Sequence, residues 1–514
     1  MFRRKYLYLY FIIEIKIRIS MSLKAILPIK SIFRITIGLC FFVLYFHAVA
    51  QIPQPLNRFL QRPAMKGASV SFMVKDVHSG NTLYGYETER EMTPASVLKT
   101  VTTATALEIL GENFCFETSV LYDGEISDGV LNGNLYIYGS GDPTLNSSEL
   151  TTYKDSIFEI WTGAVKQAGI QKINGSVIAD ESIFDLEGVS MKWMREDIGS
   201  GYGQGSYGLN IFDNRFMLYV NTGATGTQPT LITTDPEMPF LQFHNYLKTG
   251  TIPSDSCYIV GFPFSNERYL YGVVRTNQSR AGISGDIPDP ALYLAHYFSD
   301  YLGYNGIGVE KEPTCYRLLS QAGEWKVTER KKLISTYSPP LVEIVRIANF
   351  VSHNLYADAL LKTLGLRYQS NRQEVVSSFE KGTRVIKDYW ERKGLNTTSL
   401  WMFDGSGLAI TDKVTVEFLC DLYIYMATKS AVSNSFVESL PQAGLDGTVR
   451  NMLRGSSLQG RARLKSGSMS RVQCYGGYIT KDGKQYAVAI LVNNFSGRQN
   501  LMRAAIEELL KALF

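Results

Sequence analysis

Residues 93–111 read TPASVLKTVTTATALEILG, and this stretch decides how the rest of the chain is interpreted. Thr93 can cap a helix, Pro94 suits its first turn and Gly111 can end it. Apolar side chains recur at helical spacing between these ends, at Val97, Leu98, Val101, Ala104, Leu107 and Leu110. The stretch is therefore predicted to be a buried helix.

Ser96 and Lys99 stand three residues apart near the start of this helix, so their side chains project from one face. A serine hydroxyl is a weak nucleophile until a base removes its proton, and a desolvated lysine amine can be that base. The spacing alone is weak evidence, because Ser378 and Lys381 repeat it in a segment crowded with charges. For that second copy a solvated helix face is expected.

Two more short motifs follow in chain order, Ser352-His353-Asn354 and Lys465-Ser466-Gly467-Ser468. Serine enzymes that react with β-lactams carry Ser-x-x-Lys, Ser-x-Asn and Lys-Thr/Ser-Gly in this order. Two other segments also match these motifs, Ser79-Gly80-Asn81 and Lys248-Thr249-Gly250, the second more literally than Lys465 does. Their context is unfavourable, because the first precedes the helix in a hairpin turn and no hairpin follows the second. Lys465 opens a predicted strand pair, so the motifs at 352 and 465 are favoured.

The three motifs predict separate chemical roles around one cleft. The backbone N–H groups of Ser96 and Ser468 can form an oxyanion hole. The segment Lys465–Ser468, with Ser466 and Gly467, can hold a substrate carboxylate. Ser352 can relay the proton from Lys99 to the leaving amine, and Asn354 can fix the substrate amide. Without their partners, Ser352 and Asn354 would be interpreted as a helix cap or turn.

Together with residues 139–144 (GSGDPT) and 404–408 (DGSGL), these motifs and their spacings resemble the class C low-molecular-mass penicillin-binding proteins. The resemblance implies an α/β (α+β) penicillin-binding or β-lactamase-like transpeptidase domain, in which helices flank an antiparallel sheet and a large, mostly β insertion interrupts the chain. It also implies serine-type D-Ala-D-Ala carboxypeptidase or endopeptidase activity on peptidoglycan stem peptides. Ser96 would form the acyl-enzyme, and β-lactams would acylate the same serine as covalent inhibitors.

The chain divides by pattern into three parts. Short β-like runs separated by turns fill residues 115–330, for which a mostly β insertion of two subdomains is expected. Helical periodicity returns after Pro340, and a β-pattern over 462–493 precedes a final amphipathic helix near 499–513. We therefore expect one catalytic domain built from residues 51–114 and 331–514.

Asp142 and His353 each have two interpretations. The resemblance implies that Asp142 binds the amine of a diaminopimelate side chain, but a Gly-Asp-Pro turn explains this residue almost as well. His353 occupies the middle of the second motif, where the family pattern differs, and packing or capping is favoured over a role in proton transfer. Serines at 466 and 468 replace frequent threonines and keep both hydroxyls.

Residues 1–50 are predicted to be a signal peptide, which implies export and a periplasmic location. Lys24, Lys30 and Arg34 precede an apolar run over 35–50 that ends in Ala-Val-Ala. The alternative is a membrane anchor, but this run is shorter than the roughly 20 residues that span a bilayer. No transmembrane anchor is expected after cleavage. Residues 1–20 could be an over-called start, with Met21 as the initiator.

Composition and motif content exclude several classes. Residues 1–50 hold eight Lys and Arg and one Glu, or +7, against +4 for the whole chain, so the remainder carries −3 and does not resemble a nucleic-acid binder. No metal-binding His-Glu-x-x-His or phosphate-binding loop occurs, so no metal and no cofactor are expected. Five cysteines remain after Cys40, too widely spaced to indicate a zinc site or a disulfide framework.

Two alternatives to the peptidase stay open at this point. A serine β-lactamase shares the acylation machinery, but no Glu-x-x-x-Asn lies between Asn354 and Lys465 to supply a water-activating base. A non-catalytic wall-binding scaffold would have no need of Ser96, Lys99, Ser352, Asn354 and Lys465 together.

Overall fold

The computed structural model describes residues 53–150, 156–369 and 375–514, and Gln54–Phe514 forms one compact unit. The predicted signal peptide over residues 1–50 lies outside the described residues. No helix in the described part has the length and apolar character needed to cross a bilayer.

A five-stranded antiparallel sheet joins the two ends of this unit, in the order β19-β20-β21-β1-β2. Its strands are β1 (Ser69–Asp76), β2 (Thr82–Tyr86), β19 (Ala462–Met469), β20 (Val472–Lys481) and β21 (Lys484–Asn493). Asp482 and Gly483 turn the last hairpin with φ values of 51° and 76°, the left-handed pair that a tight antiparallel hairpin needs. Strands from opposite ends of the chain therefore form one sheet, as predicted.

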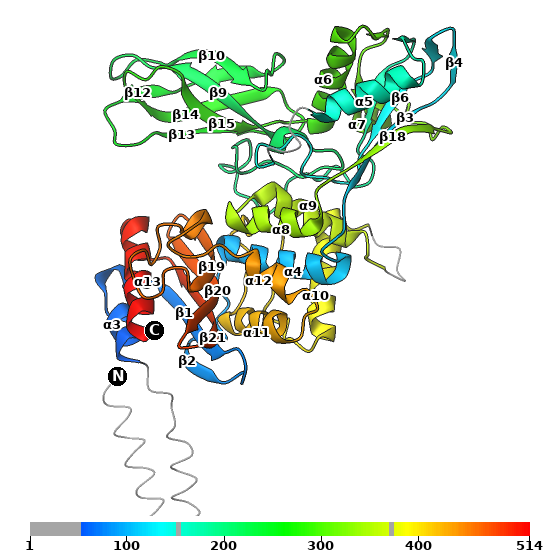
Figure 1. Ribbon diagram of the computed structural model, residues 1–514. Coiled ribbons are helices and arrows are strands. Elements are labelled where there is room, and N and C mark those ends of the chain that lie inside the picture. The colour runs from blue at the N-terminus through cyan, green and yellow to red at the C-terminus, as the bar shows by residue number, and fades with distance from the viewer. Residues whose placement is uncertain (1–52, 151–155, 370–374) are drawn as a thin grey trace, which may run out of the picture. The chain divides into compact units, whose positions relative to one another are not determined.

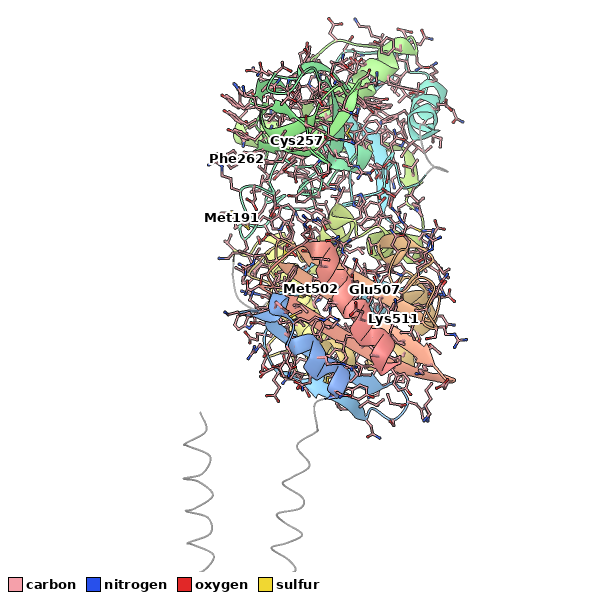
Figure 2. The ribbon with its side chains drawn as sticks, turned by 90° about the vertical axis from the view of Figure 1, so that its left-hand side faces the viewer. Met191, Cys257, Phe262, Met502, Glu507 and Lys511 are labelled. Carbon is pink, nitrogen blue, oxygen red and sulfur yellow. The ribbon has the colours of Figure 1, made fainter. Side chains whose placement is uncertain are left out.

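Alternating residues of the sheet face two separate cores. Met73, Ala489 and Leu491 pack with the helices on one side, whereas Phe72, Ile490 and Val492 pack on the other. Helix α11 (Val416–Thr428) covers the first face, and α3 (Gln54–Leu60) and α13 (Gln499–Leu513) cover the second (Figure 1). Figure 2 shows Met502, Glu507 and Lys511 along α13, where Met502 is buried and Lys511 pairs with Glu507 at 3.7 Å.

The predicted helix after Thr93 forms and is buried. Its α-helical part is α4 (Lys99–Leu110), in which every residue from Lys99 to Leu107 is buried, and Gly111 ends it with φ 84°. Around it lie α8 (Leu341–Phe350), α9 (Asn354–Gly365), α10 (Ser378–Arg392) and α12 (Ser433–Glu438). A helix enclosed by other helices needs apolar or internally bonded side chains all round, which explains its broad apolar pattern.

Residues 115–330 contain most of the remaining strands. Sheet β17-β8-β6-β3-β18 consists of β3 (Glu117–Tyr122), β6 (Leu135–Tyr138), β8 (Val177–Asp180), β17 (Thr314–Cys315) and β18 (Lys331–Tyr337). A second sheet consists of β4 (Glu125–Ser127), β5 (Val130–Asn132), β7 (Lys172–Ile173) and β16 (Gly308–Val309). Strand β18 pairs with β3 and therefore lies in the same sheet as the inserted strands. The expected domain boundary at residue 331 lies just before β18, so it separates β18 from the sheet to which it belongs.

Two further sheets of this region share its core. One contains β9 (Arg215–Asn221), β10 (Thr230–Asp235) and β15 (Ala281–Asp286), and the other contains β11 (Gln242–Asn245), β12 (Lys248–Gly250), β13 (Ser256–Gly261) and β14 (Glu267–Arg275). The described residues of this part also form the helices α5 (Ser156–Gln167), α6 (Pro290–Tyr304) and α7 (Tyr316–Gln321). A core separate from those around the central sheet is centred on Trp161, Phe158 and Phe298. The five described cysteines are all unpaired.

Candidate active site

Ser96 lies in a single 3₁₀ turn, η2 (Ala95–Leu98), immediately before α4. Lys99 is the first residue of α4, and its Nζ lies 3.0 Å from Ser96 Oγ. The expected cap at Thr93 is wrong, because the Thr93 N–H donates to Asn493 Oδ1 at 2.9 Å and its hydroxyl bonds the Ile410 carbonyl. These contacts tie the start of the helix to β21 and place Ser96 at the surface of the buried helix.

The Lys99 amine has three partners, and their chemistry orients it. Besides Ser96 Oγ, its Nζ donates to Asn354 Oδ1 at 2.6 Å and to the Ser406 carbonyl at 2.7 Å. The amide oxygen of Asn354 and the carbonyl oxygen of Ser406 can only accept hydrogen bonds. A neutral amine has two N–H bonds, so it satisfies both acceptors and turns its lone pair toward the Ser96 hydroxyl.

Burial makes the neutral form of Lys99 accessible. The Lys99 side chain is fully buried, and this lowers its pKa from 10.5 to about 8, although the carboxyl groups of Asp358, Asp404 and Asp412 act in the opposite direction. An amine with this pKa is partly unprotonated near neutral pH, which an ordinary lysine is not. Lys99 can therefore accept a proton from Ser96.

The second and third motifs meet at Lys465. Its Nζ donates to Ser352 Oγ at 2.8 Å and to the Ser466 carbonyl at 2.8 Å. Burial, followed by repulsion from Lys99, holds the pKa of Lys465 well below its usual value. Ser352 has a left-handed backbone with φ 63°, an unusual conformation for a serine, in the short connection between α8 and α9.

Strand β19 passes directly beside the serine. A Cβ on Gly467 would lie 3.0 Å from the backbone nitrogen of Ser96 and 2.6 Å from the Pro94 carbonyl, so glycine is required for this approach. The hydroxyl of Ser466 donates to Thr448 Oγ1 at 2.7 Å, and the exposed Ser468 donates to Gln473 Oε1 at 3.0 Å. The Lys465–Ser468 segment thus lies along one side of Ser96, as predicted.

Asn354 begins α9 and is held on both sides of its amide. Its oxygen accepts from Lys99, and its Nδ2 donates to the Tyr202 carbonyl at 2.7 Å. These two contacts determine which way the amide is turned. Tyr202 belongs to the region between motifs one and two, so that region contributes directly to the site.

The structure does not bring Asp142 into this network. Its buried carboxyl group accepts from the N–H of Thr144 at 2.8 Å and from the Thr144 hydroxyl at 2.7 Å, and burial raises its pKa to about 6. It lines a separate pocket of about 190 Å³ with residues such as Asn146 and Thr336. The Gly-Asp-Pro turn therefore accounts for Asp142, and a role in substrate binding stays a prediction.

His353 points away from Ser96 toward the inserted region. Its side chain is 3% exposed, packs against the Tyr356 ring at 4.4 Å between centroids, and places Nε2 3.4 Å from Asp213 Oδ1. The favoured interpretation of His353 as a packing residue agrees with this position. Although burial acts in the opposite direction, the neighbouring His353 ring and the Ser147 hydroxyl hold the pKa of Asp213 below its usual value.

The repeated motif at Ser378 has a different environment from Ser96. Ser378 Oγ donates to Asp185 Oδ1 at 3.0 Å, and its N–H bonds the same carboxylate, so this serine is a buried attachment point rather than a solvated residue. The segment at Lys248 is the short strand β12, far along the chain in the inserted sheet. Among the described residues no group of His, Cys, Asp and Glu could hold a metal ion.

Sequence reasoning missed two contributors to the site, the carbonyls of Ser406 and Tyr202. Both residues contribute a backbone carbonyl, so their side-chain types do not reveal this role in the sequence. The DGSGL segment around Ser406 contributes to the family resemblance, but it does not predict a contact with Lys99. No pattern in the sequence indicates that Tyr202 lies at the site.

Comparison with known proteins gives consistent matches over nearly the whole chain. The family model described as D-Ala-D-Ala carboxypeptidase 3 (S13) family matches residues 52–513. The D-alanyl-D-alanine carboxypeptidase of Actinomadura sp. (strain R39) is 26% identical over 468 residues, covering 87% of this chain and 82% of the relative. The D-alanyl-D-alanine carboxypeptidase DacB of Haemophilus influenzae is 25% identical over 435 residues, covering 84% and 86%.

Solved structures agree with the predicted fold class. The crystal structure of penicillin binding protein 4 (dacB) from Haemophilus influenzae has a TM-score of 0.77 at 22% identity, covering 90% of this chain and 98% of that one. The same protein complexed with a β-lactam gives a TM-score of 0.72. The similarity confirms the penicillin-binding fold with its large inserted region.

Proposed function

The chain belongs to the D-Ala-D-Ala carboxypeptidase 3 (S13) family of serine-type peptidases, and on this premise we propose that Ser96 cleaves the D-Ala-D-Ala bond of peptidoglycan stem peptides. The observation that carries the proposal is the geometry of Lys99, whose amine has two acceptor-only partners and Ser96 Oγ at 3.0 Å. This arrangement supports Ser96 as the nucleophile and Lys99 as its base.

In the acylation step the Ser96 oxygen attacks the carbonyl carbon of the penultimate D-Ala while Lys99 takes the hydroxyl proton. The C–N bond then breaks and the terminal D-Ala amine leaves with a proton from Ser352. Lys465 donates to the Ser352 oxygen, so the hydroxyl hydrogen of Ser352 remains free for the leaving amine. Ser352 recovers its proton from Lys99, and water then hydrolyses the ester.

Strand β19 supports the placement of the substrate. It is the edge strand of the central sheet, so an extended peptide can add beside it. The backbone N–H groups of Ser96 and Ser468 would stabilise the negative oxygen, and the hydroxyls of Ser466 and Ser468 would hold the terminal carboxylate. Asn354 would bond the substrate amide. The half-buried side chains of Ser96 and Ser352 are reachable, whereas both lysines are fully buried.

β-Lactams present a strained amide with a carboxylate at the same relative position, so they would acylate Ser96 and block the enzyme. The proposal places the protein in the periplasm, where the substrate is found, after removal of residues 1–50. The reaction as written uses only side chains and water, without a metal or cofactor.

A fluorescent penicillin tests the proposal directly. Incubation of the purified protein is expected to give a stable covalent label on the wild type and none on Ser96→Ala, with mass spectrometry locating the adduct on the peptide that contains residue 96. Rapid release of the label would indicate a β-lactamase instead. Ser378→Ala, at the repeated motif, is the matched control and should still be labelled on the peptide that contains residue 96.

The products from purified peptidoglycan distinguish the two peptidase activities of the family. Loss of one alanine from stem pentapeptides supports a carboxypeptidase, whereas conversion of cross-linked dimers to monomers supports an endopeptidase. If the protein is labelled by penicillin but forms neither of these products from peptidoglycan, the proposed substrate is wrong.

A further inference from the structure

The turn Asp404–Gly407 supplies one of the two acceptors that orient the Lys99 amine, through the carbonyl of Ser406. Exact placement of this carbonyl matters because a shift of the acceptor turns the amine lone pair away from Ser96. A carbonyl on a surface loop would be free to move. The structure shows why this one is not.

Asp404 holds the turn from within. One carboxylate oxygen accepts from the N–H groups of Ser406 at 3.1 Å and Gly407 at 2.6 Å. The other accepts from the Ala409 N–H at 2.8 Å and from the indole Nε1–H of Trp193 at 2.7 Å. Four N–H donors bond this one fully buried side chain, so the turn is held in a single conformation.

The turn is also held from outside by close packing. A Cβ on Gly407 would lie 2.1 Å from the Ala95 carbonyl, and one on Gly405 would lie 2.5 Å from the Ala357 carbonyl. The Gly405 N–H donates to Asp358 Oδ1 at 2.7 Å, and the Thr102 hydroxyl donates to the Gly405 carbonyl at 2.8 Å. The turn is therefore wedged between η2, α4 and α9.

Trp193 connects this turn to the region between the first two motifs. The segment that contains Trp193 is attached to α9 at other points: the Lys362 amine donates to the carbonyls of Glu187 at 2.9 Å and Ser206 at 2.8 Å. Tyr202 of the same segment holds Asn354, which is the second acceptor of Lys99. Both acceptors that orient Lys99 are thus held by one segment, residues 187–206.

We propose that Asp404 is a positioning residue for Lys99, acting through the Ser406 carbonyl, and that the indole N–H of Trp193 couples this turn to the inserted region. The inference rests on the proposed acylation at Ser96. Neither residue touches the reacting atoms. In this arrangement the inserted region does more than bind a large substrate, because the segment 187–206 determines whether the general base is correctly oriented.

The electrostatic surroundings of Lys99 give the role a measurable signature. Burial favours the neutral form of Lys99, whereas the carboxyl groups of Asp358 on α9 and of Asp404 and Asp412 in the loop before α11 favour its protonated form. The amine of Lys465 on β19 is repelled by a protonated Lys99. Since the carboxyl group of Asp404 raises the pKa of Lys99, its replacement by a neutral amide should lower that pKa.

Asp404→Asn is the first test, with the rate of acylation by a fluorescent penicillin measured from pH 6 to pH 10. Whichever way the new amide is turned, its N–H₂ faces two N–H donors, so the turn must shift. We expect the plateau rate to fall about a hundredfold, a typical contribution of a positioned base, and the rising limb to move to lower pH. If the maximal acylation rate falls but the pH at which the rate rises is the same as in the wild type, the role of Asp404 is purely structural and the inference is overturned.

Trp193→Phe is the second test, because it removes one donor to Asp404 and keeps an aromatic ring. We expect the acylation rate at saturating penicillin to fall about tenfold with little change in apparent binding, the usual loss for a hydrogen bond to a charged group. Trp161→Phe is the matched control: Trp161 is fully buried in the core of the inserted region, and its Nε1 donates to Thr336 Oγ1 at 3.2 Å.

Equal acylation by Trp193→Phe and Trp161→Phe would overturn the coupling, and this comparison decides the matter if Asp404→Asn does not fold. Failure of the proposed function looks different. In that case the wild-type protein itself would not be labelled at Ser96.

Discussion

The amine of Lys465 donates a 2.8 Å hydrogen bond to the hydroxyl oxygen of Ser352, although the two residues stand 113 positions apart. This contact joins the second motif to the third, while the contacts of Lys99 join the first motif to the second through Asn354. Three short motifs, each weak alone, thus form one hydrogen-bonded group.

Ser352→Ala should slow acylation by about 10²–10⁴-fold, the range expected when a proton-transfer group is lost. The substitution removes the hydroxyl that would protonate the leaving amine and leaves the buried Lys465 amine without one acceptor. The measurement is the second-order rate constant for labelling by fluorescent penicillin. Ser79→Ala, in the exposed hairpin turn, is the control and should label like the wild type. An undiminished rate in Ser352→Ala would exclude a role for Ser352 in proton transfer.

The rate of acylation should rise with pH through about 8. The pKa of Lys99 is lowered to about 8, and only the neutral amine can accept the Ser96 proton. The neutral fraction is about one tenth at pH 7 and nearly complete at pH 9, so the rate should increase about tenfold over that interval. The arginine in Lys99→Arg stays charged from pH 7 to pH 9, so this variant should show no such rise of the rate with pH. A rate that is constant from pH 6 to pH 9 would contradict Lys99 as the base.

Gly407→Ala should destabilise the protein by about 3 kcal/mol or more, because left-handed strain adds to a steric clash. Gly407 has φ +77°, and its Cβ would lie 2.1 Å from the Ala95 carbonyl. Gly306→Ala is the control, since φ is +82° there but no atom lies within 4 Å of the added Cβ. That variant should lose only about 1–2 kcal/mol. Urea unfolding of both variants gives the comparison, and equal losses would show that the close approach to Ala95 is unimportant.

Lys362→Met should reduce stability by about 1–3 kcal/mol for each carbonyl that loses its donor. The Lys362 amine is fully buried and donates to the carbonyls of Glu187 and Ser206. Its folded-state pKa of about 8 lies below the unfolded value of 10.5, so the unfolded state binds the proton more tightly. Keeping this buried amine protonated therefore lowers the stability of the wild type below about pH 8, and stability rises as the pH increases from about 8 toward 10.5. Its two hydrogen bonds to carbonyls favour the folded state throughout.

Unfolding of Lys362→Met as a function of pH checks both points. The wild type should gain stability between pH 8 and pH 10, and the variant should gain less, because Lys99 and Lys465 contribute in the same direction. Lys166→Met, at an exposed position of α5, is the control and should leave the profile unchanged. Identical pH profiles of Lys362→Met and the wild type would contradict the buried position of this amine.

Local patterns were sufficient for the elements that frame the site. The β-pattern over 462–493 predicted the strands that form β19, β20 and β21, and apolar spacing predicted α4 and its end at Gly111. The start of that helix was predicted less well, because Thr93 bonds Asn493 and Ile410 instead of capping. A residue with a strong local preference is overruled when distant partners satisfy its polar groups in the folded chain.

The sequence by itself predicted Ser96 as nucleophile, Lys99 as base and the order of the three motifs, because these predictions depend on residue types at short spacings. Only the tertiary structure decided what orients the base, how Lys465 reaches Ser352 and where Asp142 and His353 point. The carbonyls of Ser406 and Tyr202 are chemically the same as every other backbone carbonyl, so no residue marks them in advance. Their role arises from position alone, after the chain has brought segments some hundreds of residues apart against one buried amine.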